Sequence, residues 1–186
     1  MRVMEERWAP GETEHCSLAL VNTRLVVSGT PVDLLADDAT ATRWLSAHPA
    51  AAGCVVDRAR LTSLREAIRR LFEARAAGAV PDPADLDLVN AAASAAPPVP
   101  VLTWDGAGPR LAEDRGRRSE TARAMARLAA DAMALVTGPE AESLAPCLAH
   151  GCTRWFVRTH AARQWCSNRC GDRVRAARHY ARAKQT

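Results

Sequence analysis

The stretch CLAHGCTRWFVRTHAARQWCSNRC, from Cys147 to Cys170, decides the fold of the C-terminal part of the chain. It holds four of the six cysteines in two close pairs, with four residues between Cys147 and Cys152 and three between Cys166 and Cys170. Zinc binds thiolates in a tetrahedron, and a pair with a few residues between its members brings both sulfurs to one side of the ion. The spacing therefore predicts one structural zinc ion held by these four cysteines.

Alternative ligands and chemistries are less consistent with this pattern. Iron–sulfur clusters also use thiolates, although usually at other spacings, and His150 or His160 could replace a cysteine. Four thiolates leave no open position on the ion, and neither a phosphate-binding glycine loop nor an HExxH motif occurs, so no enzyme is predicted. The isolated Cys16 and Cys54 are expected to be buried thiols.

The residues between and after the cysteine pairs predict a small finger. The run 154–157 is typical of a strand, 158–162 of a turn, and 163–165 of a returning partner strand. The composition of 171–184 favours a helix, so that a knuckle, a hairpin and a helix carrying the last ligand would form a treble-clef-like zinc finger. Its few large apolar residues could not stabilise it without the metal.

Upstream of the finger, helical patterns dominate. The apolar residues of 61–72 repeat at three and four positions and predict a helix that ends near Gly78. Asp82 followed by Pro83 predicts the start of a second helix that ends at about Ala95, and Ser119 predicts the start of a third that ends before Gly138. Short helices are expected over 39–47 and 139–144.

Two segments of this part favour strands. The β-formers of 97–104 lead into an Asp105-Gly106 turn, which predicts a hairpin with 110–112. The run 17–35 fits a helix or a strand on either side of a turn at 28–31. The predicted fold class is therefore α+β: a mostly α-helical N-terminal domain, residues 1–144, with a small β-hairpin component, followed by the finger, residues 145–186.

Charge divides the chain at the same place. The net charge is +4, but the segment from Cys147 onward has nine basic residues and one acidic residue, or +8. The remainder has 16 basic and 20 acidic residues, or −4. A basic appendage on an acidic body is typical of nucleic-acid binding, whereas a solvated helix or one that docks on an acidic protein surface would have the same charge.

The predicted C-terminal helix would present its basic residues on one face. Arg175, Arg178 and Arg182 recur at three and four positions, while Val174, Ala177 and Ala181 would pack on the finger. Arginine suits phosphates and guanine edges. The residues predicted to bind nucleic acid are Arg173, Arg175, Arg178, His179, Arg182 and Lys184.

Several of these motifs together resemble a known family. Arg163 to Ser167, the tetrad Cys170-Gly171-Asp172-Arg173 and the basic tail are similar to the CGNR zinc-finger proteins, named for a Cys-Gly-Asn-Arg tetrad. The runs 18–23 and 31–35 resemble the ABATE domain that precedes that finger. Two departures stand out: Asp172 replaces the asparagine, and the last cysteine pair encloses three residues where many members have four.

The resemblance implies a bacterial, stress-responsive transcription regulator that binds DNA. No segment resembles a membrane span or a signal peptide, so a cytoplasmic protein is expected, associated with the nucleoid if it binds DNA. The N-terminal domain could sense a small ligand with Asn22, Thr23, Trp44 and Trp104. The alternatives are a zinc-stabilised protein–protein interaction module, an RNA binder, or a small-molecule sensor without DNA binding.

Overall fold

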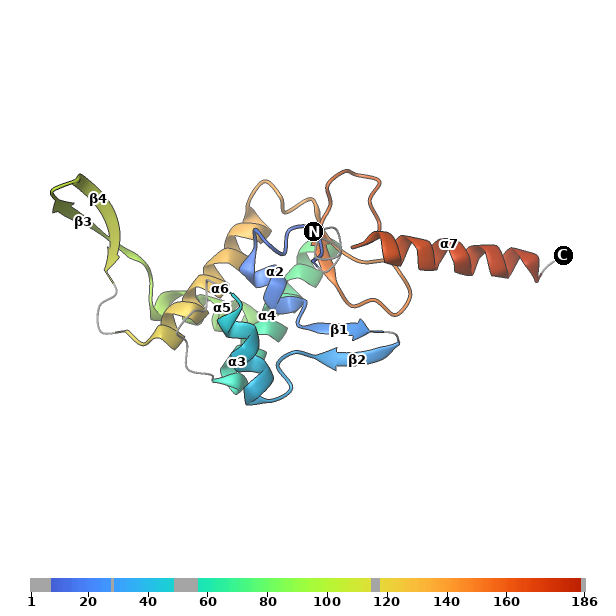
Figure 1. Cartoon of the computed structure of the whole chain (residues 1–186), viewed down its shortest axis with the longest axis horizontal. Coiled ribbons are helices and arrows are strands. Elements are labelled where there is room, and N and C mark those ends of the chain that lie inside the picture. The colour runs from blue at the N-terminus through green and yellow to red at the C-terminus, as the bar shows by residue number, and fades with distance from the viewer. Residues whose placement is uncertain (1–7, 28, 49–56, 115–117, 185–186) are drawn as a thin grey trace.

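A computed structural model describes residues 8–27, 29–48, 57–114 and 118–184. A helical body occupies the middle of the molecule, a β-hairpin projects from one end, and the C-terminal helix projects from the other (Figure 1). The helices are α2 (Cys16–Val21), α3 (Asp38–Ser46), α4 (Arg58–Ala77), α5 (Pro83–Ala95), α6 (Glu120–Thr137) and α7 (Asn168–Ala183). The strands are β1 (Arg24–Val27), β2 (Thr30–Asp33), β3 (Val99–Asp105), β4 (Gly108–Asp114), β5 (Leu144–Pro146) and β6 (Trp155–Val157).

This architecture confirms the predicted fold class, because helices dominate the body and the strands form three antiparallel pairs. The ambiguous run 17–35 contains both kinds of element, with the six-residue helix α2 followed by the β1–β2 hairpin. Among the described residues, no helix combines the length and apolar character needed to cross a membrane.

Local capping signals place the long helices where the sequence predicts them. The Asp82 side chain accepts a hydrogen bond from Ala84 N at the start of α5, and Ser119 accepts one from Ala122 N at the start of α6. The helix α4 begins after Asp57 and ends at Gly78, whose φ of 63° is left-handed. These ends fix the lengths of the helices that build the core.

The core lies between α2, α4 and α6, and α5 covers α4 and α6. Its fully buried side chains recur at helical spacing, as in Leu64, Ile68 and Phe72 of α4. Leu128 and Leu135 of α6 lie in the same cluster. The apolar residues that repeat at three and four positions in 61–72 therefore form the face that α4 buries.

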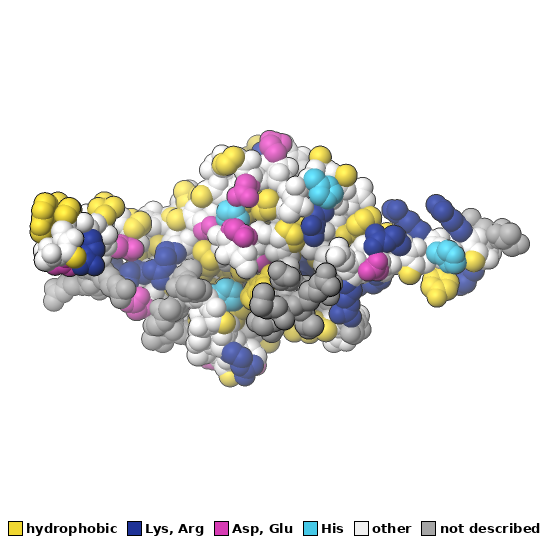
Figure 2. Space-filling model, turned by 45° about the horizontal axis from the view of Figure 1, so that its top comes forward, with side chains coloured by type: hydrophobic (Ala, Val, Ile, Leu, Met, Phe, Trp, Pro, Cys, Tyr) yellow, Lys and Arg dark blue, Asp and Glu magenta, His cyan; other side chains and the backbone are white. Residues whose placement is uncertain are grey.

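The β3–β4 hairpin stands apart from this core. The predicted hairpin is present, but its two-residue loop is Gly106-Ala107, one residue later than the predicted Asp105-Gly106 turn, because Asp105 still pairs with Gly108. Leu102 and Leu111 are cross-strand partners, and with Trp104 they are 70–79% exposed. Figure 2 shows hydrophobic side chains gathered at the hairpin end of the molecule.

Two predictions, one for the segment before the finger and one within it, were wrong. Residues 139–143 form turns rather than a helix, and the chain then enters β5. The partner of β6 is β5, with Leu144 opposite Val157, and not the run 163–165, which forms no strand. The physical reason is that the apolar residues of β5 can close the core of the body, which the polar run Arg163-Gln164 cannot.

The β5–β6 pair connects the body to the finger. Trp155 and Val157 belong to the core of the body, and Trp155 packs against Phe72 of α4 with ring centroids 5.7 Å apart. The intervening Phe156 is fully buried in a second cluster with Cys147 and Cys166. Successive side chains of a strand point to opposite faces, so this short strand contributes to both cores. The domain boundary at residue 144 stays a prediction.

Candidate metal centre and basic helix

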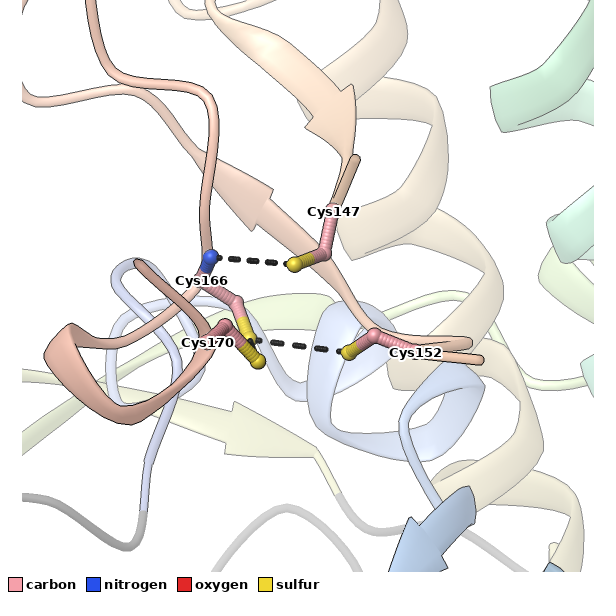
Figure 3. A group of neighbouring side chains, drawn as sticks. All are labelled: Cys147, Cys152, Cys166 and Cys170. Carbon is pink, nitrogen blue, oxygen red and sulfur yellow. Dashed lines mark hydrogen bonds between the residues drawn. The ribbon is translucent and has the colours of Figure 1, made fainter. Parts of the chain in front are cut away.

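The four cysteines lie at four different places in the finger. Cys147 follows β5, Cys152 ends the knuckle before β6, Cys166 precedes α7, and Cys170 lies in the first turn of α7. The knuckle closes through a hydrogen bond from Cys152 N to Ala149 O at 2.9 Å. The four sulfurs point toward one another (Figure 3). The predicted ligand set is thus brought together in space.

The sulfur positions fit a tetrahedral zinc ion. Cys166 Sγ lies 3.8 Å from Cys152 Sγ and 3.7 Å from Cys170 Sγ, and all four sulfurs lie within 4.8 Å of one another. A tetrahedron with zinc–sulfur bonds of about 2.3 Å requires sulfurs roughly 3.8 Å apart. The four cysteines are therefore able to hold one zinc ion.

Sulfurs so close together cannot all be charged without a cation. Hydrogen bonds from the thiols of Cys152 and Cys166 lower the pKa of Cys147 to about 2, while the hydrogen bond to Cys147 raises the pKa of Cys152 to about 11. Hydrogen bonds with Cys147 and Cys152 raise the pKa of Cys166. One thiolate thus forms at the expense of its neighbours, and a divalent ion is what would hold all four as thiolates.

Groups around the cluster stabilise negative charge on sulfur. Cys166 N donates a hydrogen bond to Cys147 Sγ at 3.4 Å, and Arg173 Nη2 donates to Cys170 Sγ at 3.9 Å. His150 and His160 are exposed, and the metal-binding group found among the described residues contains neither. All four positions of a tetrahedral ion would then be occupied by sulfur.

Gly171, the second residue of the tetrad, is the buried residue of α7. A Cβ at this position would lie 3.1 Å from Trp165 Cε3 and 3.1 Å from Arg175 Nη1, closer than ordinary van der Waals contact. The guanidinium of Arg175 lies 5.9 Å from the centre of the Trp165 ring. The glycine therefore allows α7 to approach Trp165, a packing role that the sequence pattern did not reveal.

The basic residues of α7 lie where they can meet a partner. Arg173, Arg175, Arg178, His179, Arg182 and Lys184 are all exposed. The helix projects away from the body (Figure 1), and Figure 2 shows basic side chains along this end of the molecule. The predicted packing of Ala177 and Ala181 on the finger was wrong, because both are exposed. In the first turns of α7, Gly171 is buried and Cys170 and Val174 pack against the second cluster.

The four residues predicted for a ligand pocket lie in different surroundings. Asn22 and Thr23 are buried and hydrogen-bonded within the protein, and Trp44 stacks on His48 with ring centroids 4.0 Å apart. Trp104 lies on the exposed hairpin. Neither of the two cavities described in this structure is lined by any of the four. A sensing role for these residues stays a prediction.

Of the two remaining cysteines, the structure describes Cys16. Cys16 is half-buried at the start of α2, and burial raises its pKa to about 12, so it stays a thiol as expected. Cys54 lies outside the described residues.

Comparison with known proteins agrees with this geometry. Residues 14–139 match the ABATE family, described as "Putative stress-induced transcription regulator". Residues 144–183, which include all four cysteines, match the CGNR zinc finger. A search of curated proteins gives no match. The first match covers more than half of the sequence, and this chain therefore belongs to the ABATE family and ends in a CGNR zinc finger.

Proposed function

We propose that this protein is a zinc-stabilised transcription regulator that binds double-stranded DNA through its finger and α7. The observation that carries the proposal is the exposure of α7: of its 16 residues only Gly171 is buried, and its charged side chains are mostly arginines. A free basic helix about 24 Å long suits the major groove, which admits an α-helix. The family description supports the regulatory role.

The arginines of α7 differ in their surroundings. Arg175 donates to the Asp172 carboxylate at 2.6 Å and lies over Trp165, so part of its charge is already compensated. Arg178 and Arg182 lie one and two turns further from the finger, on the same helical face. Because both are exposed and lie on one face, we assign the main phosphate contacts to Arg178 and Arg182, with Arg173 nearer the finger and Lys184 directly after α7.

In this proposal the zinc ion is structural. Cys170 lies in the first turn of α7, and Cys147 and Cys152 flank the β5–β6 connection. An ion bound to these residues fixes the direction in which α7 leaves the body. Four thiolates leave no site for a reacting water, so we assign no catalytic role. DNA binding would place the protein in the cytoplasm at the nucleoid.

The test is a salt-titrated binding assay with random double-stranded DNA and RNA. With about three to five phosphate contacts, log K should fall with log salt at a slope of roughly −3 to −5. Alanine at Arg175, Arg178 and Arg182 should flatten the slope and weaken binding to all sequences. The matched control replaces Arg58, Arg60 and Arg110 by alanine. These are exposed arginines of the body and the hairpin, and their replacement lowers the net charge by the same amount.

Each outcome separates the proposal from its alternatives. Equal losses in both triple variants would mean that net charge, and not α7, determines binding. A preference for RNA would retain the basic helix but remove the transcriptional role. If the zinc-loaded protein binds no nucleic acid at low salt, the finger is instead a protein-interaction module.

A further inference from the structure

A cavity of about 650 Å³ lies between α4 and the finger. Residues of α4 line one side, and β5, the Cys152 loop and the residue after β6 line the other. Sites for small molecules have volumes of about 300–1,000 Å³. We propose that this cavity binds a small organic monocarboxylate, whose carboxylate group faces three arginines and whose apolar part lies against the remaining wall. The arginines are Arg69, Arg75 and Arg158.

Two of these arginines form no ion pair with a carboxylate in the part of the chain that the structure describes. Arg69 and Arg158 take part in none of the ion pairs of the described residues, and the Nε atom of each is buried without a hydrogen-bond partner. Arg69 uses its Nη atoms to donate to Val21 O at 2.6 Å and Thr153 O at 3.2 Å. Burial lowers the pKa of Arg69. An anion at the cavity would compensate positive charge that the protein leaves partly desolvated.

The third arginine already binds a carboxylate from the chain itself. Arg75 Nη2 donates to Glu142 Oε1 at 2.7 Å, and the Glu142 side chain is 86% exposed. An exposed ion pair of this kind contributes little to stability, so a carboxylate from solution can replace it. Glu142 thus shows which group the cavity accepts, and it would compete with the ligand.

The other lining residues define the rest of the ligand. Leu144, Leu148 and Trp155 give the cavity an apolar wall, and Leu148 is 61% exposed although it is a large apolar residue. Apart from Cys152, whose thiolate would be bound to zinc, the charged side chains of the lining are three arginines and two glutamates, Glu73 and Glu142, with a net charge of +1. That balance favours a monoanion with an apolar body over a multiply charged phosphate. Such a ligand would contact body and finger together.

Benzoate is a suitable probe, with benzyl alcohol as its uncharged counterpart and inorganic phosphate as an oxyanion without an apolar part. The zinc-loaded protein is labelled with 5-fluorotryptophan, and the ¹⁹F signals of Trp155 and Trp104 are assigned with Trp→Phe variants. Trp155 lines the cavity and Trp104 lies on the distant hairpin. We expect benzoate to shift the Trp155 signal saturably, with Kd of about 1 mM or lower, and to leave Trp104 unchanged.

Two substitutions should change the affinity in opposite directions. Arg158→Gln removes an unpaired cation and should weaken benzoate binding about tenfold, whereas Glu142→Gln removes the competing carboxylate and should tighten it about threefold. Arg60→Gln and Glu113→Gln, on exposed residues away from the cavity, are the matched controls and should leave the affinity unchanged. Arg69 is retained, because it also holds two backbone carbonyls.

The proposal fails if benzoate causes no saturable Trp155 shift, or if Arg60→Gln weakens binding as much as Arg158→Gln does. Benzyl alcohol binding as tightly as benzoate would overturn the role of the arginines. Phosphate binding as tightly as benzoate would overturn the role of the apolar wall. None of these measurements involves nucleic acid, so the result is independent of whether α7 binds DNA.

Discussion

The side chain of Asn22 forms two hydrogen bonds with the backbone of Trp155, accepting from its N–H and donating to its carbonyl, both at 2.8 Å. Asn22 follows α2 in the body, and Trp155 is the first residue of β6. The amide therefore acts as a strand partner for β6 on the side opposite β5. Nδ2 also donates to Glu12 Oε1 at 2.6 Å, and burial raises the pKa of that carboxyl.

We predict that Asn22→Ala lowers the free energy of unfolding by about 2–4 kcal/mol, because it leaves the buried N–H and carbonyl of Trp155 without partners. Urea unfolding followed by circular dichroism measures the change. Asn90→Ala, on the exposed face of α5, is the control and should change stability by less than about 0.5 kcal/mol. Equal effects of the two variants would show that the Asn22–Trp155 contact does not hold the finger to the body.

His15 predicts a pH dependence of stability. Burial favours the neutral imidazole, but Glu140, 2.9 Å from Nε2, and Asp131, 3.1 Å from Nδ1, outweigh this and raise the pKa of His15 above its ordinary value of 6.5. A raised pKa in the folded state means that the stabilisation is fully present below about pH 6.5. It is lost as the pH rises through the folded-state pKa.

The measurement is urea unfolding at a series of pH values on both sides of that range. The wild-type protein should lose stability toward alkaline pH, with a slope of at most about 1.4 kcal/mol per pH unit from this group, and His15→Gln should abolish that part of the slope. His160→Gln, on an exposed loop, should behave as wild type. An unchanged slope in His15→Gln would mean that the histidine does not bind an extra proton on folding.

The zinc centre predicts one zinc per chain, measured by elemental analysis of the purified protein. Cys166→Ser should lose the metal and unfold the finger, while most of the helical circular dichroism signal remains, because the body has its own core. Cys16→Ser should keep the metal, since Cys16 lies outside the cluster. Metal retained in Cys147→Ser but lost in His150→Ala would contradict a four-cysteine site.

Local signals made much of this structure predictable. Asp82-Pro83, Ser119 and Gly78 determine helix ends through contacts within a few residues, so a single sequence is enough to find them. The four cysteines also form a local pattern, because a metal needs pairs at short spacing.

What the sequence did not reveal depends on distant contacts. The three-residue strand β5 exists because β6 pairs with it and both close the core of the body. Asn22 was a candidate for a ligand pocket because its hydrogen-bond partner, which lies 133 positions away in the sequence, could not be identified from the sequence. The sequence predicted too large a contact between α7 and the finger. A helix face of alanines has the same sequence pattern whether another element covers it or not.

The replacement of the tetrad asparagine by Asp172 leads to the last prediction. Asp172 and Arg175 form an ion pair at 2.6 Å with side chains 71% and 59% exposed, so the pair itself contributes little to stability. Asp172→Asn would free the Arg175 guanidinium and remove the one acidic residue of the finger, at a cost of at most about 1 kcal/mol from the lost charge at the helix N-terminus. If α7 binds DNA as proposed, affinity for random double-stranded DNA at low salt should rise about threefold, and the salt slope should steepen by up to about 1. Asp87→Asn, which changes the net charge equally on the exposed surface of α5, should leave both quantities unchanged. An equal gain in the two variants would mean that total charge determines the affinity, and no gain in Asp172→Asn would mean that Arg175 does not face the nucleic acid.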